Sequence, residues 1–325
     1  MRSLKIGTVL ILVLISLGLT DARGKSLKKA SFMTHWLPHA QFAGFYVAYE
    51  KGLYKKHGID LTIIPGSPNR SSYEYLRDGK ADFVTLWLSS GIKMRAEGLK
   101  VVNISQIVQR SGFMLIAKKT SGINTILDIR NKKVGLWAAP FDLRPMALFL
   151  KYDIKVKVVP QSASLNLFLR GGVHMASAMY YNEYHTLLNS GLDSHELTPF
   201  FFRDYGLDFP EDGIYTLEDR LTSDPDLCRA FVNASQEGWL YAFANPDDAV
   251  DIVMKLLRDA HIPANRVHQK WMLEQMRDLT LRDTGSGPLW KLSKEGFIRT
   301  CGEMKRIGFV ERVPDYNELY KDLSR

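Results

Sequence analysis

Apolar and polar positions along residues 31–217 follow two alternating periods, which predicts strands and helices in turn. The expected strands of the first half lie at 31–36, 60–64, 83–87 and 101–108, and the helices at 41–56, 71–77 and 89–97. After a polar stretch, the second half has expected strands at 133–137, 155–159 and 174–179, and helices at 141–152, 163–170 and 182–189. Strands that alternate with helices favour parallel pairing and right-handed crossovers, so an α/β fold is expected.

The last third of the chain is predicted to be helical. The expected helices lie at 226–243, 247–258, 263–281 and 291–307. Ser223 and Asn245, each followed within two residues by a proline, mark two of the helix starts. We expect these helices to pack on the first lobe, because that arrangement needs only two crossovers, near 112–120 and 210–220. The expected domains are therefore a discontinuous first lobe (25–117 and 218–325) and a second lobe (118–217).

Two α/β lobes joined by two strands form a cleft that the carboxyl ends of both sheets face. Ligands of open α/β sheets bind at such a crevice. Two connecting strands can also act as a hinge that closes over a ligand. The predicted architecture therefore indicates ligand capture.

The N-terminus has the pattern of a secretory signal peptide. Two basic residues, Arg2 and Lys5, precede the apolar residues 6–19, and small residues follow before Lys25. The apolar core is too short to span a bilayer comfortably. We expect cleavage after residues 1–24 and a soluble periplasmic monomer that starts near Lys25. An uncleaved membrane anchor is the alternative, whereas the absence of a nearby cysteine excludes lipid attachment.

Composition and charge narrow the class of protein further. The 325 residues, 46% hydrophobic and 24% charged, are typical of a globular protein. The net charge of +8 falls to +6 without residues 1–24, and the basic residues are mostly interleaved with acidic ones, which argues against nucleic acid binding. Cys228 and Cys301 could form one disulfide or remain buried thiols. Neither a CxxC motif nor a zinc-type spacing occurs, so metal and redox functions have no support.

Several motifs together resemble one family. They are His-Trp-Leu-Pro-His-Ala-Gln-Phe-Ala-Gly-Phe-Tyr-Val-Ala at 35–48, Gly-Leu-Tyr at 52–54 and His-Gly-Ile-Asp at 57–60. The likeness continues through 76–83, 98–102, 128–135 and 181–184, so it covers nearly the whole chain after residue 25. The chain resembles the thiamine-pyrimidine-synthase-like family of substrate-binding proteins for ABC importers.

The resemblance implies a type II periplasmic binding protein without a cofactor, whose partners are an ABC permease and ATPase. Its ligand would be an aminopyrimidine precursor of thiamine, riboflavin or a smaller sulfonate-type solute. An alternative is a pyrimidine synthase-like enzyme, since eukaryotic relatives make the thiamine pyrimidine with pyridoxal phosphate. Those relatives carry a lysine and a histidine four residues apart and a cysteine-rich run, which residues 66–72 and the rest of this chain lack. A sensory ligand-binding module is a further alternative.

Four candidate binding residues belong to the first lobe. Trp36 follows the first strand and could stack on a flat heteroaromatic ligand, or it could be a core tryptophan. Gln41 stands at the start of the next helix, where free N–H groups can bind an oxygen. Asn69 and Trp87 follow the second and third strands. Residues with expected structural roles are the helix caps Ser71 and Ser89 and the core residues Phe42, Phe45 and Tyr49.

The second lobe contributes Trp137 and the segment Tyr181, Asn182 and Glu183, each after a predicted strand. A carboxylate at Glu183 can accept paired N–H donors from an aminopyrimidine or a flavin, and Asn182 can donate and accept. Glu183 could instead stabilise the first turn of its helix. We expect His185 to be a packing or surface residue. Aromatic side chains in four candidate positions favour an aminopyrimidine first and a flavin second.

Overall fold

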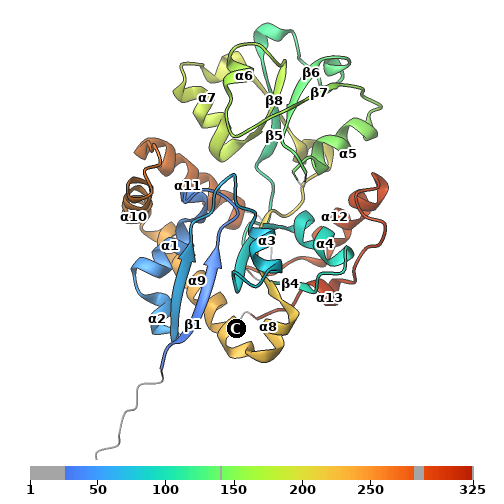
Figure 1. Ribbon diagram of the computed structural model, residues 1–325. Coiled ribbons are helices and arrows are strands. Elements are labelled where there is room, and N and C mark those ends of the chain that lie inside the picture. The colour runs from blue at the N-terminus through green and yellow to red at the C-terminus, as the bar shows by residue number, and fades with distance from the viewer. Residues whose placement is uncertain (1–25, 140, 282–288, 324–325) are drawn as a thin grey trace, which may run out of the picture.

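The computed structural model describes residues 26–139, 141–281 and 289–323. The expected signal peptide (1–24) and the start near Lys25 lie outside the described residues. Among the helices of the described part, none has the length and apolar character needed to cross a membrane. The chain forms two lobes, each built on a five-stranded sheet (Figure 1).

The first sheet has the strand order β2-β1-β3-β10-β4. Its strands are β1 (Lys28–Met33), β2 (Ile59–Ile64), β3 (Phe83–Trp87), β4 (Val101–Gln106) and β10 (Asp212–Leu217). β1, β2 and β3 are parallel, while β10 runs antiparallel to both β3 and β4. The helices between these strands are η1 (Ala40–Phe42), α1 (Ala43–Glu50), α2 (Leu53–Lys56), α3 (Ser72–Arg77) and α4 (Leu88–Ala96).

The second sheet has the order β7-β6-β8-β5-β9. Its strands are β5 (Phe113–Lys118), β6 (Lys133–Leu136), β7 (Lys157–Pro160), β8 (Met175–Met179) and β9 (Leu197–Phe201). β5 runs antiparallel to β8 and β9. The helical segments are η2 (Lys119–Ser121), η3 (Ile126–Ile129), α5 (Leu143–Lys151), α6 (Asn166–Leu169), the π-helix η4 (Tyr180–Tyr184), α7 (His185–Asn189), η5 (Ser194–Glu196) and η6 (Phe202–Tyr205).

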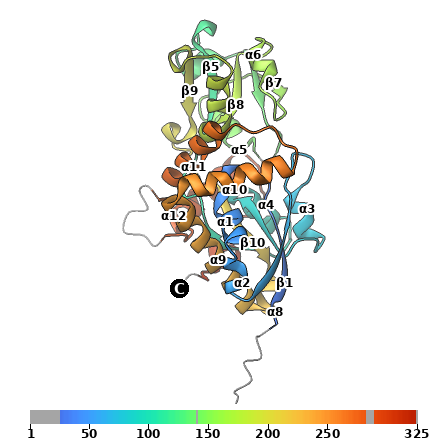
Figure 2. The same cartoon turned by 90° about the vertical axis from the view of Figure 1, so that its left-hand side faces the viewer.

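The C-terminal helices cover the first lobe. They are α8 (Glu218–Ser223), α9 (Pro225–Ala244), α10 (Pro246–Asp259), α11 (Arg266–Leu281), α12 (Lys294–Arg306) and α13 (Tyr316–Leu319). α9 packs against α1, and the Phe231 ring of α9 stacks on Phe83 of β3 with ring centres 4.1 Å apart. Figure 2 shows α10 and α11 running across the side of the molecule, with α11 next to the second lobe.

The chain passes between the two sheets twice, after β4 and before β10. The connecting segments hydrogen-bond to each other, since the N–H groups of Ile107 and Val108 donate to the Asp212 carbonyl at 3.0 and 2.8 Å. β5 belongs wholly to the second sheet and β10 to the first. Strand pairing therefore places the two changes of sheet before residue 113 and before residue 212. The lobe boundaries expected from the sequence, 117/118 and 217/218, lie about five residues later and remain a prediction.

Several details of the predicted elements are wrong. The predicted strands that alternate with helices are parallel as expected, but the two expected crossovers, near 112–120 and 210–220, form the sheet strands β5 and β10, which run antiparallel to their neighbours. The expected helix 41–56 is interrupted at Gly52, whose φ of 69° is left-handed. Asp224, not Ser223, caps α9, because its carboxylate accepts the Leu227 N–H at 3.1 Å. Ser71 caps α3 as expected, whereas Ser89 lies inside α4.

The predicted core is confirmed for Phe42 and Phe45, which are buried, and wrong for Tyr49, which is 45% exposed. Tyr49 lies in the last turn of α1. Cys228 and Cys301 are both buried free thiols, which decides between the two alternatives left open for them.

Candidate functional site

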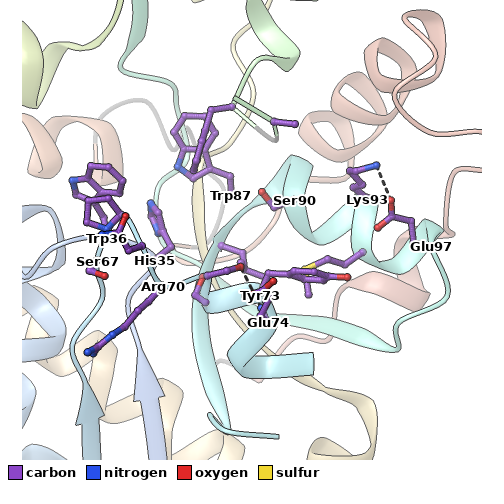
Figure 3. A pocket seen from close by; sticks show the side chains of 18 residues that line it. His35, Trp36, Ser67, Arg70, Tyr73, Glu74, Trp87, Ser90, Lys93 and Glu97 are labelled. Carbon is purple, nitrogen blue, oxygen red and sulfur yellow. Dashed lines mark hydrogen bonds and ion pairs between the residues drawn. The ribbon is translucent and has the colours of Figure 1, made fainter. Parts of the chain in front are cut away.

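The cleft between the lobes holds two adjoining cavities. The inner cavity has a volume of about 250 Å³ and the outer cavity about 520 Å³. Both are lined by His35, Trp36, Pro68, Trp87, Ala139 and Phe141. Figure 3 shows the outer cavity, which extends from Trp36 and Trp87 towards the Lys93–Glu97 ion pair on α4.

The structure brings the predicted site residues together. The inner cavity is lined by Trp36, Gln41, Trp87, Trp137, Tyr181, Asn182 and Glu183. Asn69 lines the outer cavity instead. These side chains come from the segments after β1, β2 and β6, from the end of β3, and from η1 and η4, so most lie at or after the carboxyl end of a strand. Their contact with a ligand remains a prediction.

The loop after β1 holds Trp36 in place through its backbone. The Thr34 hydroxyl donates to the Trp36 carbonyl at 2.9 Å. Gly66, in the loop after β2, lies so close that a Cβ atom there would stand 2.2 Å from the same carbonyl oxygen. Only glycine permits this approach. The Trp36 ring itself is half-buried, which is compatible with a stacking surface at the cavity wall.

Aromatic side chains form the rest of the wall. Trp87 is 4% exposed and meets the Phe141 ring edge-on at 4.6 Å, so most of its surface already packs against protein. Trp137 is less buried and stacks on Phe113 with ring centres 5.1 Å apart. Trp36 and Trp137, from opposite lobes, therefore retain more free surface for a ligand than Trp87 does.

His35 is a polar group of the cleft that the sequence reasoning missed. Its backbone N–H donates to Thr85 Oγ1 at 2.9 Å, and its ring Nδ1 lies 3.0 Å from the same oxygen. Burial lowers the pKa of His35 to about 3, so the ring is neutral at physiological pH. The Thr85 hydroxyl can donate to Nδ1 or accept from it, and Nδ1 also lies 3.7 Å from Asp212 Oδ1.

Glu183 lies on the π-helix η4, directly after β8, rather than in the first turn of the predicted α-helix. Its Oε2 accepts the Met179 N–H at 2.8 Å and its Oε1 accepts from Asn182 Nδ2 at 2.7 Å. The side chain is 7% exposed, and this burial raises its pKa to about 7, while both donors act in the opposite direction. Single turns of π-helix are frequent at functional sites.

A cluster of buried charges lies beside the connecting segments, near the cavity wall. Arg144 of α5 donates to the Phe209 carbonyl at 2.8 Å, and its guanidinium lies 5.0 Å from the Trp87 ring. Glu211 accepts from the Ser111 hydroxyl at 2.7 Å. Burial raises the pKa values of Glu211 and Asp212 to about 8, against the pull of the Arg144 charge.

Other cavity residues missed from the sequence lie close to predicted ones. Arg70 follows Asn69, and Phe141 follows the loop that holds Trp137. Gln161 extends β7 beyond its carboxyl end, and its amide bonds to the backbone of Ser177 at 2.8 and 2.9 Å. Because Gln161 directly follows a strand, as the predicted residues do, it could have been found from the sequence.

Within residues 26–139, 141–281 and 289–323, no group of three or more His, Cys, Asp or Glu residues could hold a metal ion.

The two lobes and the cleft between them have the type II periplasmic binding protein fold, as predicted. The chain is similar to the solved periplasmic aliphatic sulphonate binding protein SsuA of Escherichia coli, with a TM-score of 0.69 and 12% sequence identity. The superposition covers 91% of this chain and 93% of SsuA. This similarity concerns the fold alone.

Residues 39–249, more than half of the chain, match the NMT1/THI5-like family, and the chain belongs to it. One relative is the riboflavin-binding protein RibY of Chloroflexus aurantiacus, 25% identical over 85% of this chain and 82% of RibY. Another is the formylaminopyrimidine-binding protein of Halalkalibacterium halodurans, 22% identical over 81% of this chain and 82% of the relative. The predicted family is thus confirmed, and these two relatives are binding proteins.

Proposed function

We propose that this chain is the periplasmic solute-binding component of an ABC importer and closes its two lobes over a flat, nitrogen-containing heteroaromatic ligand. The observation that carries the proposal is the inner cavity, where half-buried aromatic rings from both lobes flank a buried carboxylate. Rings bind a flat π-system by stacking, and a carboxylate accepts the N–H groups at its edge.

An aminopyrimidine is the first ligand proposed and a flavin the second. A single pyrimidine ring suits the inner cavity of about 250 Å³, next to Glu183 and Asn182. A three-ring flavin with its side chain would also need the outer cavity of about 520 Å³. The names of the two relatives, which bind riboflavin and a formylaminopyrimidine, support this range. A sulfonate-type solute would use mainly small polar groups, and the inner cavity is rich in aromatic ones.

Periplasmic location and the ABC permease and ATPase as partners are part of the same proposal. The signal-peptide pattern of residues 1–24 and the fold support them. A sensory module would close in the same way, and a permease or a sensor kinase encoded next to this chain would distinguish the two. A pyridoxal phosphate-dependent synthase is less favoured, because the loop 66–72 at the outer cavity contains neither lysine nor histidine.

Fluorescence titration tests the ligand class, since tryptophans line the cleft. Hydroxymethylpyrimidine, its formylamino relative, thiamine and riboflavin are compared with taurine. Quenching by one of the heteroaromatic compounds at micromolar concentration is expected. A response to taurine alone would overturn the proposal. Mass spectrometry of material released by denaturing the purified protein identifies any ligand that is retained from the cell.

A further inference from the structure

Helix α11 of the first lobe contacts recognition residues on both sides of the cleft. The Gln269 side-chain oxygen accepts the N–H of Ala40 at 2.8 Å, at the start of the segment that carries Gln41. Trp271 Nε1 donates to the carbonyl of Tyr180 at 3.2 Å, at the start of η4. Figure 2 shows α11 in this position between the lobes.

His268, on the same helix, is connected through Asn182 to the buried carboxylate of Glu183. Asn182 Nδ2 donates to Glu183 Oε1, so the Asn182 oxygen points the other way. His268 Nε2 lies 3.1 Å from that oxygen. An amide oxygen only accepts, so His268 donates from Nε2. The order of donors is therefore His268 to Asn182 to Glu183.

The far side of the His268 ring faces His185 of α7. Burial, and to a smaller degree the neighbouring His185, lower the pKa of His268 to about 4, so the ring is neutral at physiological pH. With its proton on Nε2, the bare Nδ1 of His268 accepts from Nδ1 of His185, 2.9 Å away. Asn189 Nδ2 lies 3.1 Å from the same His185 Nδ1, and a half-turn of the Asn189 carboxamide presents its oxygen to that proton instead. His268 is thus held between α7 and η4 of the second lobe.

We propose that His268 is a positioning residue of the binding site, which orients the Asn182 amide and thereby the Glu183 carboxylate towards the ligand. The inference rests on the proposed function, because Glu183 is there the group that recognises the ligand. His268 lines neither the inner nor the outer cavity. Since it belongs to the first lobe and Asn182 to the second, this hydrogen bond also links carboxylate orientation to the contact between lobes.

Two substitutions distinguish the roles of the two ring nitrogens of His268. His268→Gln extends an amide about as far as Nε2 and keeps a donor for Asn182, whereas His268→Asn reaches only as far as Nδ1 and loses it. Affinity for hydroxymethylpyrimidine and for riboflavin is measured by calorimetric titration. We expect affinity to fall about 3- to 10-fold in His268→Asn, the effect of one neutral hydrogen bond, and less than about 2-fold in His268→Gln.

Trp271→Phe is the matched control, because it removes another hydrogen bond between the same two segments but leaves Asn182 bonded. Its affinity should stay within about 2-fold of the wild type. Equal losses in Trp271→Phe and His268→Asn would overturn the proposal in favour of a general packing role for α11. Equal affinities in the two His268 variants would overturn it as well.

A ligand-free measurement separates this inference from the proposed function. The titration of Glu183 is followed by ¹³C NMR of the carboxyl group. Loss of an oriented Asn182 donor should raise the Glu183 pKa in His268→Asn but not in His268→Gln. An unchanged titration in His268→Asn would overturn the positioning role. Wild-type protein that binds neither compound would contradict the proposed function, while the NMR result would still decide the role of His268.

Discussion

At the scale of single residues, Glu183 is subject to two opposing effects. Burial disfavours its ionised form, whereas the donors Met179 N–H and Asn182 Nδ2 favour it. The resulting pKa of about 7 leaves the carboxyl group near its midpoint at neutral pH. Further N–H donors from a ligand would favour the carboxylate. Binding of such a ligand should therefore be accompanied by loss of a proton.

Glu183→Gln should weaken hydroxymethylpyrimidine binding at pH 8 by about 10- to 100-fold, because a charge-assisted hydrogen bond contributes roughly 1.5–3 kcal/mol. The glutamine nitrogen would also oppose a ligand N–H. Wild-type affinity should fall as the pH drops below about 7, where Glu183 becomes protonated, and affinity of the variant should not. Calorimetric titration from pH 5.5 to pH 8 measures both. Unchanged affinity would remove Glu183 from the site.

At the scale of elements, the hydrophobic pattern predicts β2 and β3 to within one residue, but it misses β5 and β9. β5 is buried over Phe113–Ala117 and shows no period that would distinguish it from a connecting segment. β9 contains Pro199, which argues against a strand. β9 lies at the edge of its sheet, where a missing N–H is tolerated.

The candidate site could be predicted as far as its residues follow strands. Trp36, Trp87 and Trp137 lie at or shortly after the ends of β1, β3 and β6. Ligands of open α/β sheets bind beyond the carboxyl ends of the strands, so these residues could be predicted. Arg144 and His268 reach the same region from the first turns of helices α5 and α11. Their place depends on how the helices pack across the lobes, and no spacing in the sequence encodes that.

The close contact of α9 with α1 depends on Gly238. A Cβ atom there would lie 2.1 Å from the Gly44 carbonyl oxygen and 2.7 Å from the Ala48 Cβ. Gly238→Ala should therefore lower the free energy of unfolding by about 1–3 kcal/mol or more, as overpacking does. Gly302→Ala in α12 is the control, since no atom lies within 4 Å, and it should gain about 0.5–1 kcal/mol. Urea denaturation compares the two, and equal stability of both variants would contradict the close contact.

At the scale of the whole molecule, buried ionisable groups set how stability depends on pH. The pKa values of Glu211 and Asp212 are raised to about 8, so between their ordinary values and pH 8 the folded protein binds more protons than the unfolded chain. Stability then falls as pH rises. Buried His35 and His268, with pKa values lowered to about 3 and 4, have the opposite effect, which fades as the pH rises past their ordinary value of 6.5.

The free energy of unfolding of the ligand-free protein should therefore fall by on the order of 1–3 kcal/mol between about pH 6.5 and about pH 8.5. At pH 6.5 His35 and His268 are about half protonated in the unfolded chain, so they oppose the fall by about 0.4 kcal/mol each, less than the buried carboxyl groups contribute. Asp212→Asn, which resembles the protonated acid, should show a smaller fall. Urea denaturation at the two pH values tests this, and an equal fall in variant and wild type would rule out Asp212 as a source.

The position of β10 between β3 and β4 governs the order in which the chain can fold. The first sheet stays open until residues 212–217 arrive, although its other four strands end at residue 106. The second sheet comes from one continuous stretch, 113–201, and its contacts are closer in sequence, which favours earlier folding. Pulse-labelled hydrogen exchange during refolding should show protection in β5 and β8 before β3 and β4. A growing chain that ends just after residue 201 would hold one finished lobe and one incomplete sheet.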